Sequence, residues 1–252
     1  HVRSRRQRQM CIRDRHCNML SVDKLSIDYG QFSIHADNLT FENGLHVLIG
    51  ENGSGKSSLL TGIIGYNTKD IKARKLAFNH TPIDRTADYI SYLPQQNIPF
   101  QITVEDFIKM TAAKRPAQKD TDRVLRDFKL EEFRHVSADS LSGGEFKRAL
   151  CAQIHFEDKP VLMFDEVEQG LDINYQHLVM TWLKKLSSCR IVIMAMHDLN
   201  LALSYADTVT SMKRGTLTEV KVPAAKVTEK MLSDTFSREM KICLLYTSDA
   251  AD

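Results

Sequence analysis

Apolar and polar residues alternate in short runs along the first part of the chain. Over residues 20–49 this alternation predicts a group of antiparallel strands that ends in the apolar strand 45–49. Residues 66–93 are variable and polar, and they end in a further predicted strand over 89–93. Pro94 follows directly and ends that strand, because proline cannot donate a ladder hydrogen bond.

Helical spacing replaces alternation in the middle of the chain. Apolar residues from about Thr103 onward share one face of a predicted helix, which Pro116 ends. A second amphipathic helix is expected over 119–129, and a third from Glu145 to about Phe156.

Strand and helix patterns then alternate to the end of the packed region. The predicted elements are a strand over 161–164, a helix over 175–186, a strand over 191–196, a helix over 199–205 and a pair of strands around Gly215. Such alternation implies an α/β domain with a largely parallel sheet, whose ligand lies at the carboxyl ends of the strands.

The two ends do not share these patterns. Residues 1–18 hold six arginines and one aspartate, and both they and residues 242–252 resemble translated sequencing-adapter text. We expect both to be non-native tails and Met19 to be the native start. The rival interpretation of the first tail is a basic arm for nucleic acid or anionic lipid. Between the tails, roughly 220 residues suffice for one α/β domain.

Charge and cysteine content change once the tails are set aside. The chain carries a net charge of +2, of which residues 1–18 supply +5 and residues 242–252 supply −2, so the core is close to −1. The basic pI therefore gives no indication of a nucleic-acid partner, and none is expected. Of the five cysteines only Cys151 and Cys189 remain, which fits a reducing compartment.

Residues 50–57 carry the first chemical motif. Their sequence, Gly-Glu-Asn-Gly-Ser-Gly-Lys-Ser, follows a predicted strand and precedes a predicted helix from Lys56 to about Ile64. This is the phosphate-loop pattern, in which glycines let backbone N–H groups curl around a polyphosphate. Lys56 is expected to bridge the outer phosphates, and Ser57 to bind Mg²⁺. The predicted nucleotide-binding residues of the loop are Gly50, Asn52, Gly53, Ser54, Gly55, Lys56, Ser57 and Ser58.

Two further motifs narrow the family. Residues 141–145 read Leu-Ser-Gly-Gly-Glu, and residues 161–166 read Val-Leu-Met-Phe-Asp-Glu. With these motifs in this order, residues 19 to 240 resemble the ATPase subunits of ABC transporters. The resemblance implies a single ABC ATPase domain over 19–241, with its core over 19–95 and 149–241. A helical subdomain over 96–148 would be inserted into that core.

Asp165 would end a buried strand, where a carboxylate is costly unless a cation compensates it. Mg²⁺ held by Asp165 and Ser57 would supply that compensation. The resemblance implies that Glu166 is the general base and that His197 contacts the γ-phosphate. It also implies that Gln95, with Gln96 as the fallback, reaches the metal and the attacking water.

Other implied contacts lie further from the phosphates. Tyr29 would stack on adenine, although a plain core aromatic is the alternative for this residue. Ser142, Gly143 and Gly144 would bind the ATP held by a second ATPase subunit, and Asp172 would touch that subunit. Two positions depart from the family pattern: Val167 stands for the usual proline, and Glu145 for the usual glutamine.

The end of the core resembles importer ATPases for iron-siderophores, haem and cobalamin, in the segments 197–215 and 226–236. Zinc or manganese importers, exporters and non-transport ABC ATPases are the alternatives. The longest apolar run, 191–196, is far short of the roughly 18 residues that span a bilayer. The expected partners are therefore a second ATPase subunit in a homodimer, transmembrane permease subunits and, indirectly, a substrate-binding protein.

That assembly would place the chain on the cytoplasmic face of the plasma membrane as a peripheral subunit. The apolar cluster Ile98, Pro99, Phe100 and Ile102 is expected to dock the permease, because such a cluster usually marks a partner site. The alternative for these four residues is ordinary packing of a small subdomain.

Overall fold

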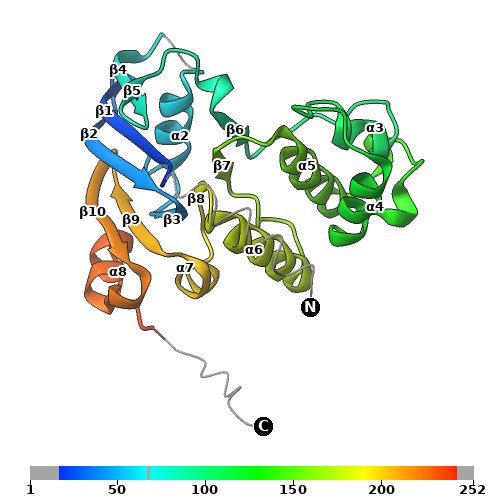
Figure 1. The fold of residues 1–252 in the computed structure, drawn as a ribbon. Helices are drawn as coiled ribbons and strands as arrows, with labels where there is room; N and C mark the ends of the chain where they lie inside the picture. The colour runs from blue at the N-terminus through cyan, green and yellow to red at the C-terminus, as the bar shows by residue number, and fades with distance from the viewer. Residues whose placement is uncertain (1–16, 67–68, 243–252) are drawn as a thin grey trace.

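Two β-sheets of different kind lie against each other, with a group of helices beside them (Figure 1). The computed structural model describes residues 17–66 and 69–242, so the predictions for residues 1–16 and 243–252 concern residues outside these ranges. The four-stranded antiparallel sheet has the order β2 (Ser33–Glu42), β1 (Met19–Asp28), β4 (Ile71–Phe78) and β5 (Thr81–Pro82). The six-stranded sheet has the order β10 (Thr216–Pro223), β9 (Thr208–Lys213), β3 (Gly44–Ile49), β8 (Ile191–Ala195), β7 (Val161–Asp165) and β6 (Ile90–Leu93).

The five strands from β9 to β6 run parallel, and only β10 is antiparallel. Because successive side chains of a strand point to opposite faces, β8 serves two cores. Ile191 and Ile193 pack into the core shared with the antiparallel sheet, whereas Val192 and Met194 pack into the helix-covered core. Burial on both faces explains why the strand is apolar throughout.

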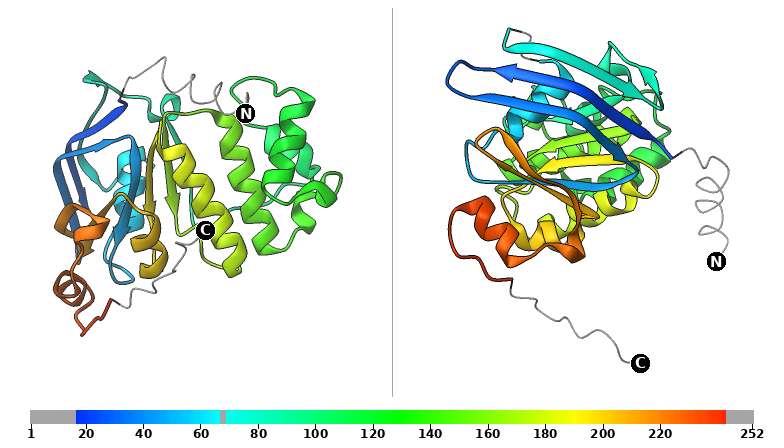
Figure 2. Two further views of the ribbon diagram at one scale, coloured as in Figure 1. Left: turned by 60° about the horizontal axis from the view of Figure 1, so that its bottom comes forward. Right: turned by 90° about the vertical axis from the view of Figure 1, so that its left-hand side faces the viewer.

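Helix α2 (Lys56–Ile64) contributes Leu59, Leu60 and Ile63 to the core between the two sheets. The opposite face of the parallel sheet is covered by the later helices, as two further views show (Figure 2). The helices that pack against this sheet are α5 (Gly143–Glu157), α6 (Ile173–Ser187), α7 (Leu199–Tyr205) and α8 (Glu229–Phe236). Two more helices, α3 (Val104–Lys109) and α4 (Gln118–Asp127), lie on the far side of α5 (Figure 1). Among the described residues no helix combines the length and apolarity needed to cross a membrane.

The predicted fold class is confirmed, with three differences in detail. β3 does not continue the antiparallel group but enters the parallel sheet between β8 and β9. The segment read as variable and polar contains β4, which pairs antiparallel with β1. The helix predicted to reach Pro116 ends at Lys109, because the Ala113 N–H donates to the Phe156 carbonyl of α5 instead of continuing the helix.

The last residue of the first predicted tail, Asn18, and the first residue of the second, Ile242, both form hydrogen bonds with the domain. Asn18 Nδ2 donates to the Cys189 carbonyl at 3.0 Å, and the Ile242 N–H donates to Glu229 Oε1 at 2.9 Å. The tail and subdomain boundaries themselves stay predictions.

Candidate functional site

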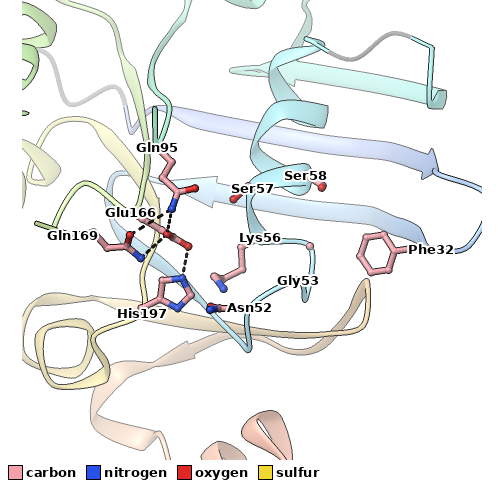
Figure 3. A pocket seen from close by; sticks show the side chains of 11 residues that line it. Phe32, Asn52, Gly53, Lys56, Ser57, Ser58, Gln95, Glu166, Gln169 and His197 are labelled. Atoms are coloured by element: carbon pink, nitrogen blue, oxygen red, sulfur yellow. Dashed lines mark hydrogen bonds and ion pairs between the residues drawn. The ribbon is translucent and has the colours of Figure 1, made fainter. Parts of the chain in front are cut away.

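A pocket of about 410 Å³ lies at the carboxyl ends of neighbouring strands (Figure 3). The phosphate loop follows β3, Gln95 follows β6, Glu166 follows β7 and His197 follows β8. Since these four strands are adjacent in the parallel sheet, segments far apart in sequence meet at one edge. The pocket is lined by Phe32, Asn52, Gly53, Gly55, Lys56, Ser57, Ser58, Gln95, Glu166, Gln169 and His197.

The phosphate loop has the backbone that its glycines were expected to allow. Gly50 has φ 157°, and a Cβ there would lie 2.3 Å from the Met212 carbonyl oxygen. Gly55, at φ 108°, precedes α2, and no side chain caps that helix. The first N–H groups of α2 are therefore available to an anion, with the helix dipole adding positive potential.

Lys56 is buried, and its Nζ donates to the carbonyls of Gly50 at 2.9 Å and Glu51 at 3.2 Å. Burial lowers the pKa of Lys56, whereas the nearby carboxylates of Glu166 and Asp165 raise it. The ammonium group is thus held inside its own loop, in position to meet the outer phosphates of a nucleotide.

The predicted metal pair is in contact. Ser57 Oγ donates to Asp165 Oδ1 at 3.0 Å, and Tyr92 Oη lies 3.5 Å from Asp165 Oδ2. Burial raises the pKa of Asp165, and the Ser57 hydrogen bond opposes that rise. A hydroxyl and a carboxylate are hard oxygen donors that fit Mg²⁺, which usually takes few protein ligands and completes its shell with phosphates and water. Within the described residues no three His, Cys, Asp or Glu side chains cluster to hold a metal by themselves.

Glu166 is buried, and only 8% of its side chain is exposed. Its Oε1 forms a close contact with His197 Nε2. Its Oε2 accepts from Gln95 Nε2 at 2.7 Å and from Gln169 Nε2 at 2.6 Å. Figure 3 shows these three donors around one carboxylate. The structure therefore brings the side chains of His197 and Gln95 into contact with that of Glu166.

The signature residues lie elsewhere, at the start of α5. Ser142 caps this helix, and Glu145 completes a capping box by accepting from the Ser142 N–H at 2.8 Å. Ser142 and Gly143 are exposed, and neither they nor Gly144 line the phosphate-loop pocket. Asp172, also outside the pocket, caps α6 by accepting from two backbone N–H groups. These four predicted residues are presented to the exterior of this chain rather than to its own pocket.

The aromatic residue that lines the pocket is not the one expected from the sequence. Tyr29 is exposed and does not line the pocket, whereas Phe32 does. The two rings stack with centroids 6.1 Å apart. Phe32 also borders an adjoining cavity of about 610 Å³ that includes Gly53 and Arg214, which leaves room for a base beside the loop. An adenine contact by Tyr29 stays a prediction.

Sequence reasoning passed over several residues at this site. Gln169 donates to the Glu166 carboxylate, and Lys147 donates to the Gln169 carbonyl. Glu168 is 2% exposed, and its carboxylate accepts from the His197 N–H at 3.0 Å. None of these three residues belongs to a recognised motif. Only their closeness in sequence to the motifs at 141–145 and 161–166 could have indicated that they lie at the site. Phe32 could have been found as the second aromatic of the short segment before the loop.

Comparison with known proteins agrees with the site. The sequence profile of the family described as ABC transporter matches residues 34–169, more than half of the chain. The petrobactin import ATP-binding protein FpuD of Bacillus anthracis is 30% identical over 241 residues, covering 88% of each chain. The hemin import ATP-binding protein HmuV of Thermobifida fusca is 31% identical, covering 89% of this chain and 84% of its own.

Two other similarities complete the comparison. The zinc import ATP-binding protein ZnuC of Wigglesworthia glossinidia brevipalpis is 30% identical, covering 79% of this chain and 85% of its own. Among solved structures, cbiO1 from Clostridium perfringens, part of the ABC transporter complex cbiONQ, superposes with a TM-score of 0.68 at 23% identity. That structure covers 87% of this chain and 94% of its own, and it supports the fold alone.

The fold, the phosphate loop and the acidic strand end define a nucleotide-hydrolysing cassette. The chain belongs to the ABC transporter family, and the predicted ATPase class is confirmed by that membership.

Proposed function

We propose that this chain is the ATP-hydrolysing subunit of an ABC importer. The observation that carries the proposal is the meeting of Lys56, the Ser57–Asp165 pair and the Glu166–His197 pair in one pocket. These groups bind phosphates, hold a divalent cation and activate water, which are the parts that phosphoryl transfer to water requires.

Each group has a separate task in this proposal. The loop N–H groups and Lys56 hold the phosphates, and His197 positions the terminal one. Glu166 accepts a proton from the attacking water, which it can do only when its carboxylate is partly released from the donors around it. Ser57 and Asp165 would hold Mg²⁺, with Gln95 close by, and that ion would neutralise charge on the phosphates when bound.

We infer a dimer from the separation of the two binding elements. Ser142, Gly143 and Gly144 form an exposed helix start outside the chain's own pocket. Free N–H groups at such a position suit a phosphate, and a second copy would bring its nucleotide there. Two cassettes would then close over two ATP molecules, and Asp172 would lie at the same interface.

The cargo class rests on the relatives. Two of them are named for petrobactin and hemin import, and together they favour an iron-siderophore or haem substrate. Cobalamin import belongs to the same proposed group. The second candidate is zinc import, which the similarity to ZnuC supports. Such a subunit would work as a peripheral protein on the cytoplasmic face of the membrane, with permease subunits and, indirectly, a substrate-binding protein.

The proposed permease site is the apolar cluster of residues 98–102 together with a cleft beside Gln95. The cleft has a volume of about 560 Å³ and includes Ile98, Phe146 and Lys147. Ile98 is 83% exposed and Phe100 is 51% exposed, so the apolar cluster predicted from the sequence is partly open to a partner. Its position next to Gln95 would connect permease movement to the nucleotide pocket.

Steady-state ATPase measurements on the purified chain with Mg²⁺ test the catalytic part. Lys56→Ala should weaken nucleotide binding and abolish turnover. Glu166→Gln should retain ATP binding, lose hydrolysis and accumulate a nucleotide-bound dimer visible by light scattering. Parental hydrolysis in either variant would refute the assigned role of that residue.

The transport part needs the permease, which the genes adjacent to this one would identify. Reconstituted with it, the parental chain should show ATPase activity stimulated by a ferric siderophore or haem, and not by zinc. Phe100→Asp should keep the basal ATPase activity of the isolated chain and lose uptake. Met110→Asp is the matched control, since Met110 is similarly exposed, at 49%, and lies outside the apolar cluster of residues 98–102. Normal uptake by the Phe100 variant would exclude this docking site.

A further inference from the structure

Both oxygens of the Glu166 carboxylate are engaged, although a general base must accept a proton from water. His197 occupies Oε1, and the amides of Gln95 and Gln169 occupy Oε2. With the side chain at 8% exposure, little of the carboxylate faces solvent. Hydrolysis therefore requires some of these donors to leave while the carboxylate keeps a fixed orientation.

The three donors differ in what else they can bind. In the proposed function, His197 turns to the terminal phosphate and Gln95 to the metal and water. Gln169 has no such task. It lies on the pocket wall, three residues from Glu166, and its Oε1 is 3.4 Å from Gln95 Nε2. It is thus the donor that can remain on Glu166 after the other two have moved.

The backbone that presents Glu166 and Gln169 forms a strained turn. Glu166 has φ 54°, a left-handed conformation that costs energy for a residue with a side chain. The Gln169 N–H donates to the Glu166 carbonyl at 3.2 Å and closes the turn. That closure brings the Gln169 amide back to the carboxylate of Glu166.

A cation from another helix holds this turn. Lys147 Nζ, on α5, donates to the carbonyl of Gln169 and lies 3.4 Å from the carbonyl of Glu166. Lys147 is in the first turns of the helix that begins at the signature residue Ser142, and its side chain also borders the proposed permease cleft. It therefore connects that helix directly to the turn carrying the base.

We propose that Gln169 is a positioning residue that orients Glu166 as the general base, and that Lys147 holds the turn on which both residues lie. The inference rests on the proposed function, since it presupposes that Glu166 activates water. Gln169 acts through Glu166 and does not touch the nucleotide in this proposal. A base oriented by a third group is a recurring arrangement in hydrolytic sites.

The test compares steady-state ATPase kinetics of Gln169→Met with those of the parental chain. Methionine has a similar length but no donor, so kcat should fall roughly 10- to 100-fold, as when partners of catalytic groups are removed. The KM for ATP should stay within about twofold, because ground-state binding is untouched. Gln176→Met is the matched control: its amide donates to the Glu168 carbonyl and not to Glu166, so its kcat should be unchanged.

A double-mutant cycle separates positioning from general damage. In the Glu166→Gln background, Gln169→Met should cause no further loss of the residual rate, because the group through which it acts is gone. Lys147→Met should lower kcat in the same way, and Lys147→Arg, which keeps a donor, should restore most of it. Gln169→Leu, which also lacks a donor and adds no charge beside Glu166, replaces Gln169→Met if the latter lowers the thermal midpoint.

Different results would refute the proposed function and the positioning role of Gln169. If the parental chain fails to hydrolyse ATP, or Glu166→Gln hydrolyses at the parental rate, the proposed function is wrong. If those two behave as expected and Gln169→Met keeps the parental kcat, only the present inference is overturned. It is also overturned if Gln169→Met lowers the residual rate of Glu166→Gln as strongly as it lowers that of the parental chain.

Discussion

Replacing Phe32 by alanine tests which aromatic ring holds the base of the nucleotide. Phe32 lines the pocket beside the phosphate loop, whereas the exposed Tyr29 does not line it and stacks on Phe32. A ring that stacks on a base contributes about 1–3 kcal/mol by alanine substitution. At about 1.4 kcal/mol per tenfold, Phe32→Ala should raise the Kd for ATP roughly 5- to 150-fold.

Tyr29→Ala is the comparison variant. Tyr29 supports Phe32 through an aromatic pair, which is worth about 0.5–1.5 kcal/mol. Its loss should therefore raise the Kd for ATP by no more than about twofold to tenfold. Isothermal titration of each variant with Mg²⁺ and ATP measures both effects.

Phe32 also packs against the loop, and this contact needs its own control. Phe32 Cζ lies 2.8 Å from where a Cβ of Gly55 would be, so removing the ring can loosen the loop itself. Tripolyphosphate carries no base, and its affinity should be the same for the parental chain and for Phe32→Ala. If tripolyphosphate affinity falls together with ATP affinity, or if Tyr29→Ala has the larger effect on ATP, the stacking role of Phe32 is refuted.

Three further predictions concern the loop and the core. Gly50→Ala should abolish ATP binding in a titration, because the added Cβ would meet the Met212 carbonyl at 2.3 Å; unchanged affinity would show that the loop can rearrange. Burial lowers the pKa of His46, so the fold favours its neutral form. The stability that His46 contributes is then complete above the unfolded pKa of about 6.5 and is lost as the pH falls below it. The thermal midpoint should fall between pH 7 and pH 5, and less so in a His46→Gln variant. Burial raises the pKa of the Cys151 thiol to about 12, so a thiol reagent at pH 8 should label the exposed Cys189 and spare Cys151 until the protein is unfolded, as peptide mass mapping would reveal.

The sequence predicted those parts of the fold whose patterns are local. The helices after the phosphate loop and over 199–205 were expected with the bounds that the structure has. β4 was not expected, because only its residues Leu76 and Ala77 are buried and no regular alternation of buried and exposed residues runs along it. It is a strand because β1 supplies the pairing partner, a tertiary contact that no short window of sequence contains.

The position of the aromatic wall depended on a turn that spacing alone does not define. Asp28 of β1 pairs with Ser33 of β2, and the Tyr29 N–H donates to the Phe32 carbonyl at 2.9 Å. This tight hairpin turns Tyr29 outward and places Phe32 beside the loop. Counting residues from Lys56 identified an aromatic in the right segment, but the turn decides which ring faces the pocket.

At the centre of the site, too, a local sequence pattern predicts the role of Glu166 but not its contacts. Its role follows from its place after Asp165 at the end of an apolar strand, which is a local pattern. Its orientation follows from a left-handed φ of 54° and from the lysine of a distant helix that holds the turn. Nothing in the sequence of this turn indicates a left-handed φ at Glu166, because the nearest glycine, Gly170, lies four residues further on. The chemistry of the base can thus be predicted from the motif, whereas its positioning is a property of how α5 packs against the strand end.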